Sequence, residues 1–66
     1  MPERLLNAEE VADLLGVPVS TLHYWSHRGE GGPPCARIGR RLKYRQSDVD
    51  AYIAARFAEH EAARTR

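Results

Sequence analysis

The chain lacks the features that mark membrane proteins and disulfide-stabilised secreted proteins. It holds one cysteine, Cys35, in 66 residues, so no internal disulfide can form, which fits a reducing compartment. No apolar run approaches the ~20 residues that a bilayer-spanning helix needs. The N-terminus also lacks the apolar core of a signal peptide, because polar residues follow Leu5 and Leu6 at once. We therefore expect no membrane partner.

The residue patterns of enzymes are missing too. A chain this short buries only a small core, which leaves little room for a deep catalytic pocket. The sequence shows no paired carboxylates for acid–base catalysis, no glycine-rich phosphate loop and no supported Ser-His-Asp set. His23 and His27 are four residues apart, but no third metal ligand lies near them in the sequence. We expect no catalytic activity, no metal, no cofactor and no small-molecule substrate.

The basic residues are concentrated in the middle of the chain. The net charge is +1 overall, but residues 19–46 hold six basic residues and a single acid, Glu30, which gives them +5 and leaves −4 elsewhere. A cationic stretch in a near-neutral protein predicts one face directed at a polyanion. The alternative is a solvated arginine-rich surface with no partner.

A capping box predicts the first helix. Asn7 and Glu10 have the spacing at which each side chain bonds the backbone N–H of the other. The helix is expected over 8–15, and Gly16 is its left-handed stop. Its apolar face consists of Val11, Leu14 and Leu15.

A second helix is predicted over about 18–28, because Pro18 is tolerated at a helix start and Gly29 can end one. Helical spacing places Leu22 and Trp25 on one side and polar side chains on the other. The short glycine-containing turn between the two helices gives a helix-turn-helix arrangement. The polar side comprises Ser20, Tyr24 and His27, flanked by His23 and Arg28.

Alternating residues predict a two-stranded hairpin after a glycine- and proline-rich link at 30–34, whose glycines loosen the chain and whose prolines extend it. Pairing Ile38 with Leu42 keeps both faces of the hairpin consistent, so we expect residues 39–41 to form the loop and Arg40 and Arg41 to project from its tip. The expected apolar face holds Ala36, Ile38, Leu42 and Tyr44, and the cationic face holds Arg37, Arg41, Lys43 and Arg45.

A third helix is expected to begin at a Ser47 cap, with Asp50 in the reciprocal position. The fold class is therefore mainly α with a small β-hairpin: three helices and a two-stranded wing, a winged helix-turn-helix. We expect a DNA-binding domain over 1–58 and a basic, Ala- and Arg-rich tail over 59–66. The expected buried stripe of the third helix is Val49, Tyr52, Ile53 and Phe57.

A family resemblance runs over about residues 5 to 55. It rests on residues 7–12, 14–17, 20–22, Trp25, 28–29, 33–34, 39–41, Tyr44 and 47–49. These motifs resemble the excisionase group of small winged-helix proteins, which are relatives of the MerR-type DNA-binding domain. The resemblance implies a second helix in the major groove, a hairpin wing at the minor groove or phosphates, and a buried Trp25. Excisionases bind adjacent sites, bend DNA, steer a phage integrase toward excision and catalyse nothing.

The expected contacts combine this resemblance with the outward-facing pattern. The link at 30–34 is longer and richer in glycine than the family's, and arginines are common in the family where Tyr24 and His27 stand, so we carry over no base preference. The recognition-helix contacts are Ser20, Thr21, His23, Tyr24, His27 and Arg28, and the wing contacts are Arg37, Gly39, Arg40, Arg41 and Lys43.

These expectations describe an excisionase in the cytoplasm of a bacterial host, associated with the nucleoid. We expect no effector or dimerisation domain after the DNA-binding module, and this expectation favours the role over a larger MerR-type regulator. A domain this small offers about 600–1,000 Å² of DNA contact, so we expect several copies to associate head to tail on double-stranded DNA and to meet a phage integrase. Two alternatives stay open: a stand-alone MerR-like transcription regulator, and a protein-interaction module.

Overall fold

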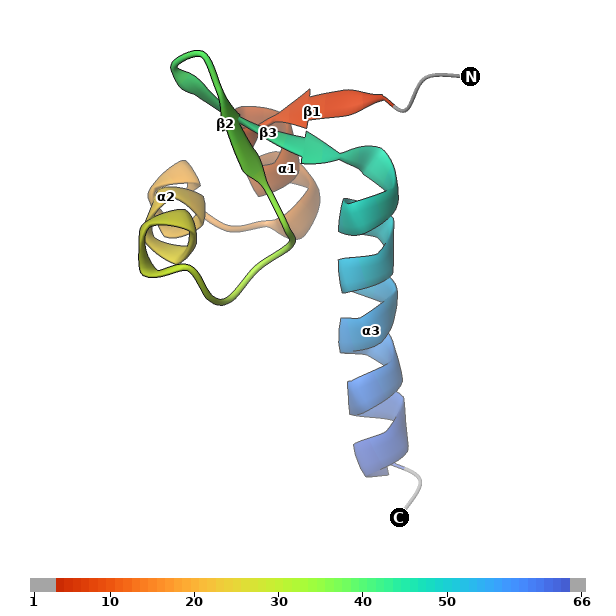
Figure 1. Cartoon of the computed structure of the whole chain (residues 1–66). Helices are drawn as coiled ribbons and strands as arrows, with labels where there is room; N and C mark the ends of the chain where they lie inside the picture. Colours follow the sequence, from red (N-terminus) through yellow and green to blue (C-terminus); the bar gives the residue numbers. More distant parts are fainter. Residues whose placement is uncertain (1–3, 65–66) are drawn as a thin grey trace.

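Three helices and a three-stranded antiparallel sheet make up residues 4–64, the part of the chain that the computed structural model describes (Figure 1). The expected fold class, a mainly helical winged helix-turn-helix, is confirmed, with one strand more than predicted. Residues 1–3 of the expected domain and 65–66 of the expected tail lie outside the described residues. The elements are β1 (Leu5–Asn7), α1 (Ala8–Leu15), α2 (Val19–Arg28), β2 (Ala36–Ile38), β3 (Arg41–Arg45) and α3 (Gln46–Arg64).

The first helix follows its local signals. The Glu10 backbone N–H donates to Asn7 Oδ1 at 2.8 Å, and the Asn7 N–H donates to Glu10 Oε1 at 3.0 Å, so the predicted capping box is present. Gly16 takes the left-handed conformation, with φ at 72°, and its N–H donates to the Ala12 carbonyl. The predicted bounds of α1 are confirmed, and α2 begins one residue after Pro18, which stands at its N-cap.

The strand β1 was not predicted. It pairs with β3 and leaves β3 in the middle of the sheet, in the order β1-β3-β2. Leu6 lies opposite Tyr44, and the Gln46 N–H donates to the Arg4 carbonyl at 3.0 Å just past the strand ends. A three-residue strand directly before a helix cap is too short to show an alternating pattern. It forms because the central strand β3 offers it a hydrogen-bonding edge.

The hairpin register differs from the predicted one. Ile38 pairs with Arg41 and not with Leu42, so the loop has two residues, Gly39 and Arg40. Gly39 has φ at 65° and Arg40 does not have a positive φ, which suits a two-residue hairpin turn that needs glycine first. The predicted register assumed that both strands bury one face, but every residue of β2 is exposed. Because β2 contributes no residue to the core, burial does not constrain its register.

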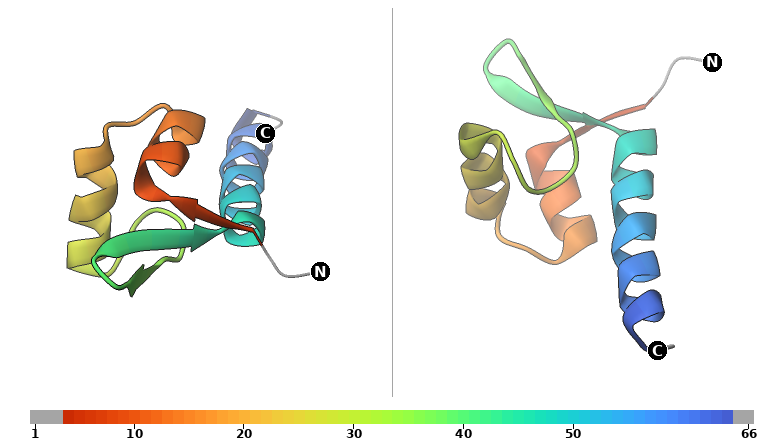
Figure 2. Two further views of the ribbon diagram at one scale, coloured as in Figure 1. Left: turned by 90° about the horizontal axis from the view of Figure 1, so that it is seen from above. Right: turned by 60° about the horizontal axis from the view of Figure 1, so that its bottom comes forward.

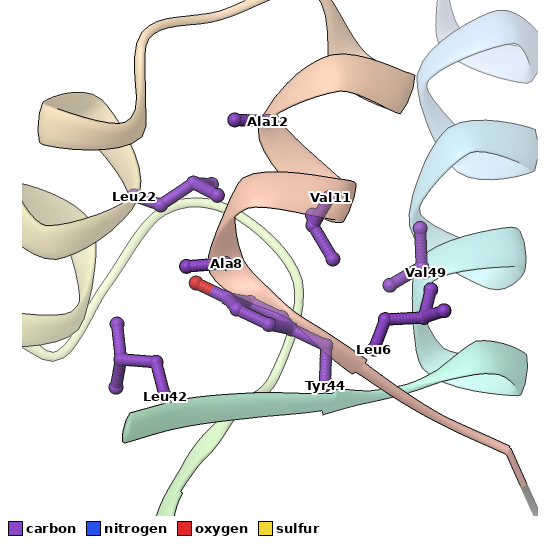
Figure 3. Packing of buried hydrophobic residues seen from close by; sticks show 8 residues of the cluster. All are labelled: Leu6, Ala8, Val11, Ala12, Leu22, Leu42, Tyr44 and Val49. Atoms are coloured by element: carbon purple, nitrogen blue, oxygen red, sulfur yellow. The ribbon is translucent and has the colours of Figure 1, made fainter. Parts of the chain in front are cut away.

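The core lies between the sheet, α1, α2 and the start of α3 (Figure 3). Tyr44 stands at its centre, with its ring between β3 and α1. Leu14 was predicted to share the buried face of α1, but 57% of its surface is exposed. The buried residues are Leu6, Ala8, Val11, Ala12, Leu22, Leu42, Tyr44 and Val49, with Leu15, Val17, Val19, Trp25 and Ile53 packed against them.

The third helix leaves the core after its first turns. It begins at Gln46, because β3 leads into it without a loop, so Ser47 lies inside the first turn and not before it. Val49 is fully buried, whereas Phe57 is 64% exposed, so the prediction of a buried Phe57 was wrong. The rest of α3 extends as a rod beyond the other elements (Figure 1). It runs unbroken past residue 58, and the division into a domain and a tail at that residue stays a prediction.

Candidate nucleic-acid interface

One side of α2 is a polar stripe. Leu22 is fully buried and Trp25 packs against the core, which fixes the rotation of the helix. The residues on the opposite side are therefore turned outward, as the sequence predicted. Four of them, at the spacing of one helix face, are exposed, and a fifth, Thr21, is partly buried at the flank. The exposed four are Ser20, His23, Tyr24 and His27.

The hairpin tip lies beside this helix. The views in Figures 1 and 2 agree that the turn between β2 and β3 projects on the side of α2 and away from α3. A shallow pocket joins the two elements, since His23 of α2 and Arg40 and Arg41 of the hairpin all line it. Glu9 of α1 lines it too, an acidic neighbour that the sequence did not place there. Of the predicted contacts, His23, Arg40 and Arg41 thus meet at one surface.

The corrected register distributes the hairpin cations over both faces of the sheet. Residues directly opposite each other in an antiparallel pair share a face, so Arg37 lies on the same face as the buried Leu42. Arg41 and Lys43 lie on the other face, with Ile38. The predicted single cationic face is therefore wrong for β2 and right for β3. Arg40 stands in the turn, between the two faces.

Most cations of the hairpin have no carboxylate partner in the part of the chain that the structure describes. Within residues 4–64, four of the five hairpin cations form no ion pair and no hydrogen bond through their side chains: Arg37, Arg40, Arg41 and Lys43. The fifth, Arg45, pairs with Asp48, and three arginines outside the hairpin also have carboxylate partners: Arg4 with Glu10, Arg28 with Glu30, and Arg56 with Glu59. Uncompensated positive charge beside an exposed polar helix is the electrostatic pattern of a polyanion-binding surface.

Arg28 and Tyr24 differ from the other predicted contacts, because their side chains are hydrogen-bonded within the chain. Arg28 Nη1 donates to Tyr24 Oη at 2.9 Å, and Arg28 Nη2 donates to Glu30 Oε2 at 2.6 Å. These two bonds, that to Tyr24 first, raise the pKa of Arg28 above its usual range. Glu30 is a residue of this surface that the sequence did not assign. The available signal was its being the one acid in residues 19–46.

The link after α2 packs on Trp25. Gly31 and Gly32 have φ values of 86° and 70°, and a Cβ atom at Gly31 would lie 2.8 Å from Cδ1 of Trp25. A Cβ atom at Gly32 would overlap the same ring at Cε3. The glycines, predicted only to loosen the link, therefore let its backbone lie against the indole. The resemblance implied a buried Trp25; its side chain packs against the core and the link but stays partly exposed.

Two further properties of the described part of the chain bear on its chemistry. Residues 4–64 contain no group of three or more His, Cys, Asp or Glu side chains arranged to hold a metal ion. In the same residues, none of the helices combines the length and the apolar composition of a membrane span.

Comparison with known proteins gives one match. A family model described as a helix-turn-helix domain matches residues 5–56, which include β1, both helices of the motif, the hairpin and the first turns of α3. No curated protein and no solved structure matches the chain with significant similarity.

Proposed function

We propose that this chain, which belongs to the helix-turn-helix domain family, binds duplex DNA with α2 in the major groove and the hairpin at the phosphates or the minor groove. Membership of the family indicates binding of double-stranded DNA; the individual contacts are our proposal. The observation that carries it is the set of hairpin cations without carboxylate partners, placed beside the exposed polar stripe of α2. Phosphates would supply the missing negative charge.

The contacts divide by chemistry. Ser20, Tyr24 and His27 project from the exposed side of α2, where they can reach base edges. Thr21 is partly buried at the flank, and we assign it to a phosphate. The wing residues Arg37, Arg40, Arg41 and Lys43 supply the charge, and Gly39 permits the tight turn that carries Arg40. His23 lies where the helix and the wing meet, and Arg28 is the last residue of α2, at the end of the helix away from Ser20.

We further propose that the protein acts as an excisionase at the nucleoid of a bacterial host. One copy offers only about 600–1,000 Å² of DNA contact, so specific binding needs neighbouring copies. The exposed acids Glu9 and Asp13 of α1 offer negative charge to arginines of a neighbouring copy, which suits a head-to-tail row. Copies that follow a curved path would bend the DNA, and this bend directs a phage integrase toward excision.

The outer part of α3 is our candidate for the integrase contact. It continues past Ile53, the last residue packed against the core, and carries the exposed Phe57. A chain cut after Phe57 keeps the core and the whole of the proposed DNA surface. We expect the cut chain to bind DNA like the full chain and to support less recombination. Recombination equal to that of the full chain would remove residues 58–66 from the integrase contact.

The experiment that tests the role is a gel-shift titration on two duplexes from the source genome: the phage attachment-site arm and the promoter of this gene. A stepwise cooperative ladder on the arm, weakened by Arg40→Ala, is the result expected of an excisionase. A single tight complex on the promoter alone would point instead to a stand-alone transcription regulator. The absence of any shift at low salt would overturn DNA binding and leave the interaction-module alternative.

A further inference from the structure

We infer that Glu30 determines specificity: it holds Arg28 at the end of α2 so that the hydroxyl of Tyr24 faces the DNA as a hydrogen-bond donor. The inference rests on the proposed DNA-binding function and concerns how the surface separates its own site from other DNA. It begins from a triad at one end of the polar stripe, formed by Tyr24, Arg28 and Glu30.

The three side chains form a continuous chain of contacts. Tyr24 and Arg28 are four residues apart on one face of α2, and Arg28 Cζ lies 5.5 Å from the centre of the Tyr24 ring. Gly29 takes the left-handed conformation, with φ at 78°, and ends the helix. This change of direction brings Glu30 back to Arg28, whose Nη2 donates to Oε2 at 2.6 Å. Arg28 is thus bonded at both terminal nitrogens.

Folding alone gives little reason for a glutamate here. Glu30 follows the C-terminal end of α2, where the helix dipole disfavours negative charge. The side chains of Arg28 and Glu30 are 50% and 69% exposed, and an ion pair this exposed contributes little to stability. The same carboxylate is the one acid in residues 19–46, next to a surface that we assign to phosphates. The negative charge of Glu30 weakens DNA binding, so we expect it to serve DNA recognition in another way, through Arg28.

Arg28 serves DNA recognition by fixing the hydrogen-bonding role of the Tyr24 hydroxyl. A tyrosine hydroxyl has one O–H donor and accepts through its lone pairs. Because Arg28 Nη1 already donates to Oη, the O–H is left to donate outward. In the major groove the acceptors are N7 and O6 of guanine, N7 of adenine and O4 of thymine. When Glu30 holds Arg28 in place, the Tyr24 hydroxyl, which could otherwise donate or accept, acts toward DNA as a hydrogen-bond donor at a fixed position.

Glu30 also keeps Arg28 from acting as a phosphate clamp. A guanidinium released from its carboxylate can turn to a DNA phosphate, a contact that strengthens binding to every sequence equally. The carboxylate itself repels phosphates that approach a misplaced complex. The triad therefore weakens binding to arbitrary DNA more than binding to the preferred site.

The test compares Glu30→Gln with the unaltered protein and with a matched control, Glu59→Gln. Glu59 belongs to a similar triad on α3, away from the proposed surface: Arg56 Cζ lies 5.4 Å from the Tyr52 ring, and Arg56 Nη2 bonds Glu59 at 3.0 Å. Both variants remove one negative charge and break one exposed ion pair. The probes are duplexes enriched by the unaltered protein from a randomised library, and poly(dI-dC) as arbitrary DNA.

We expect Glu30→Gln to bind poly(dI-dC) more tightly and to lower the preference for enriched duplexes roughly threefold or more. The slope of log K against log salt on poly(dI-dC) should steepen by about 0.9, the value of one added phosphate contact. Tyr24→Phe, which retains the ring and loses the hydroxyl, should lower the preference without steepening that slope. Glu59→Gln should change neither quantity.

Two outcomes would overturn the inference, and they are distinguishable. In the first, the unaltered protein enriches duplexes, and Glu30→Gln shows the same preference for them and the same salt slope as the unaltered protein or Glu59→Gln. Glu30 then has no part in specificity, while DNA binding stands. If the unaltered protein enriches no duplex and does not bind poly(dI-dC), the proposed function fails and this inference fails with it. Thermal unfolding of both variants checks that each is folded, as the exposure of both glutamates leads us to expect.

Discussion

Gly31 lies so close to Trp25 that a Cβ atom at Gly31 would stand 2.8 Å from Cδ1 of the indole. We predict that Gly31→Ala lowers the free energy of unfolding by about 2–4 kcal/mol, because it adds a left-handed alanine and an overlap with the ring. Gly39→Ala is the control: φ there is 65° and nothing lies within 4 Å of the added carbon. That change should cost about 1–2 kcal/mol. Urea unfolding measures both, and equal losses would show that Trp25 is not confined by the link.

Tyr44 makes stability fall at high pH. Burial, then the charge interaction and the hydrogen bond with Cys35, raise the pKa of Tyr44 to about 12. The unfolded tyrosine has a pKa of about 10, so between about pH 10 and pH 12 the unfolded chain has lost a proton that the folded chain keeps. Over this window Tyr44 should lower the free energy of unfolding by about 1.4 kcal/mol per pH unit, and below about pH 10 its contribution is complete.

Tyr44→Phe provides the measurement, because it removes this titration while the alkaline groups that do not contact Tyr44 titrate alike in both proteins. The unfolding free energy of the unaltered protein minus that of Tyr44→Phe should be constant below about pH 9 and should fall as the pH rises toward 12. A difference that stays constant throughout would mean that the phenol is not held neutral by the 2%-exposed site in which it lies.

Arg40→Ala tests the wing through its salt dependence. Arg40 has no carboxylate partner within residues 4–64, so its removal breaks no ion pair of the folded protein and should affect DNA binding alone. We expect weaker binding to all duplexes and a salt slope that is flatter by about 0.9. Arg64→Ala removes the same charge from the far end of α3 and should leave the slope unchanged. Equal slopes for the unaltered protein and Arg40→Ala would exclude the wing tip from the interface.

Local signals explain what the sequence predicted correctly. The cap formed by Asn7 and Glu10 and the left-handed stops at Gly16 and Gly29 act within a few residues, so the bounds of α1 and α2 could be read from the chain. The outward stripe of α2 followed from the inward placement of Leu22 and Trp25. The candidate surface was therefore predictable as far as it depends on a single helix.

The features that were missed depend on distant partners. The strand β1 exists because β3 offers it an edge, and Phe57 continues a helical apolar spacing after the core beneath it has ended. The contact between Arg28 and Glu30 depends on the reversal of the chain at Gly29. Hydrophobic periodicity indicates which side chains of a helix prefer burial. It does not indicate how far along the helix the core that would cover them extends.

Ile38 provides a direct test of the hairpin register. In the register predicted from the sequence it would share the buried face of Leu42, whereas it pairs with Arg41 and is 53% exposed. We predict that Ile38→Thr, which retains a β-branched side chain, changes the free energy of unfolding by less than about 1 kcal/mol. Leu42→Ala, at a 3%-exposed position in the same hairpin, should cost about 2–5 kcal/mol. Urea unfolding of the two variants measures both losses, and a cost for Ile38→Thr close to that of Leu42→Ala would favour the three-residue loop.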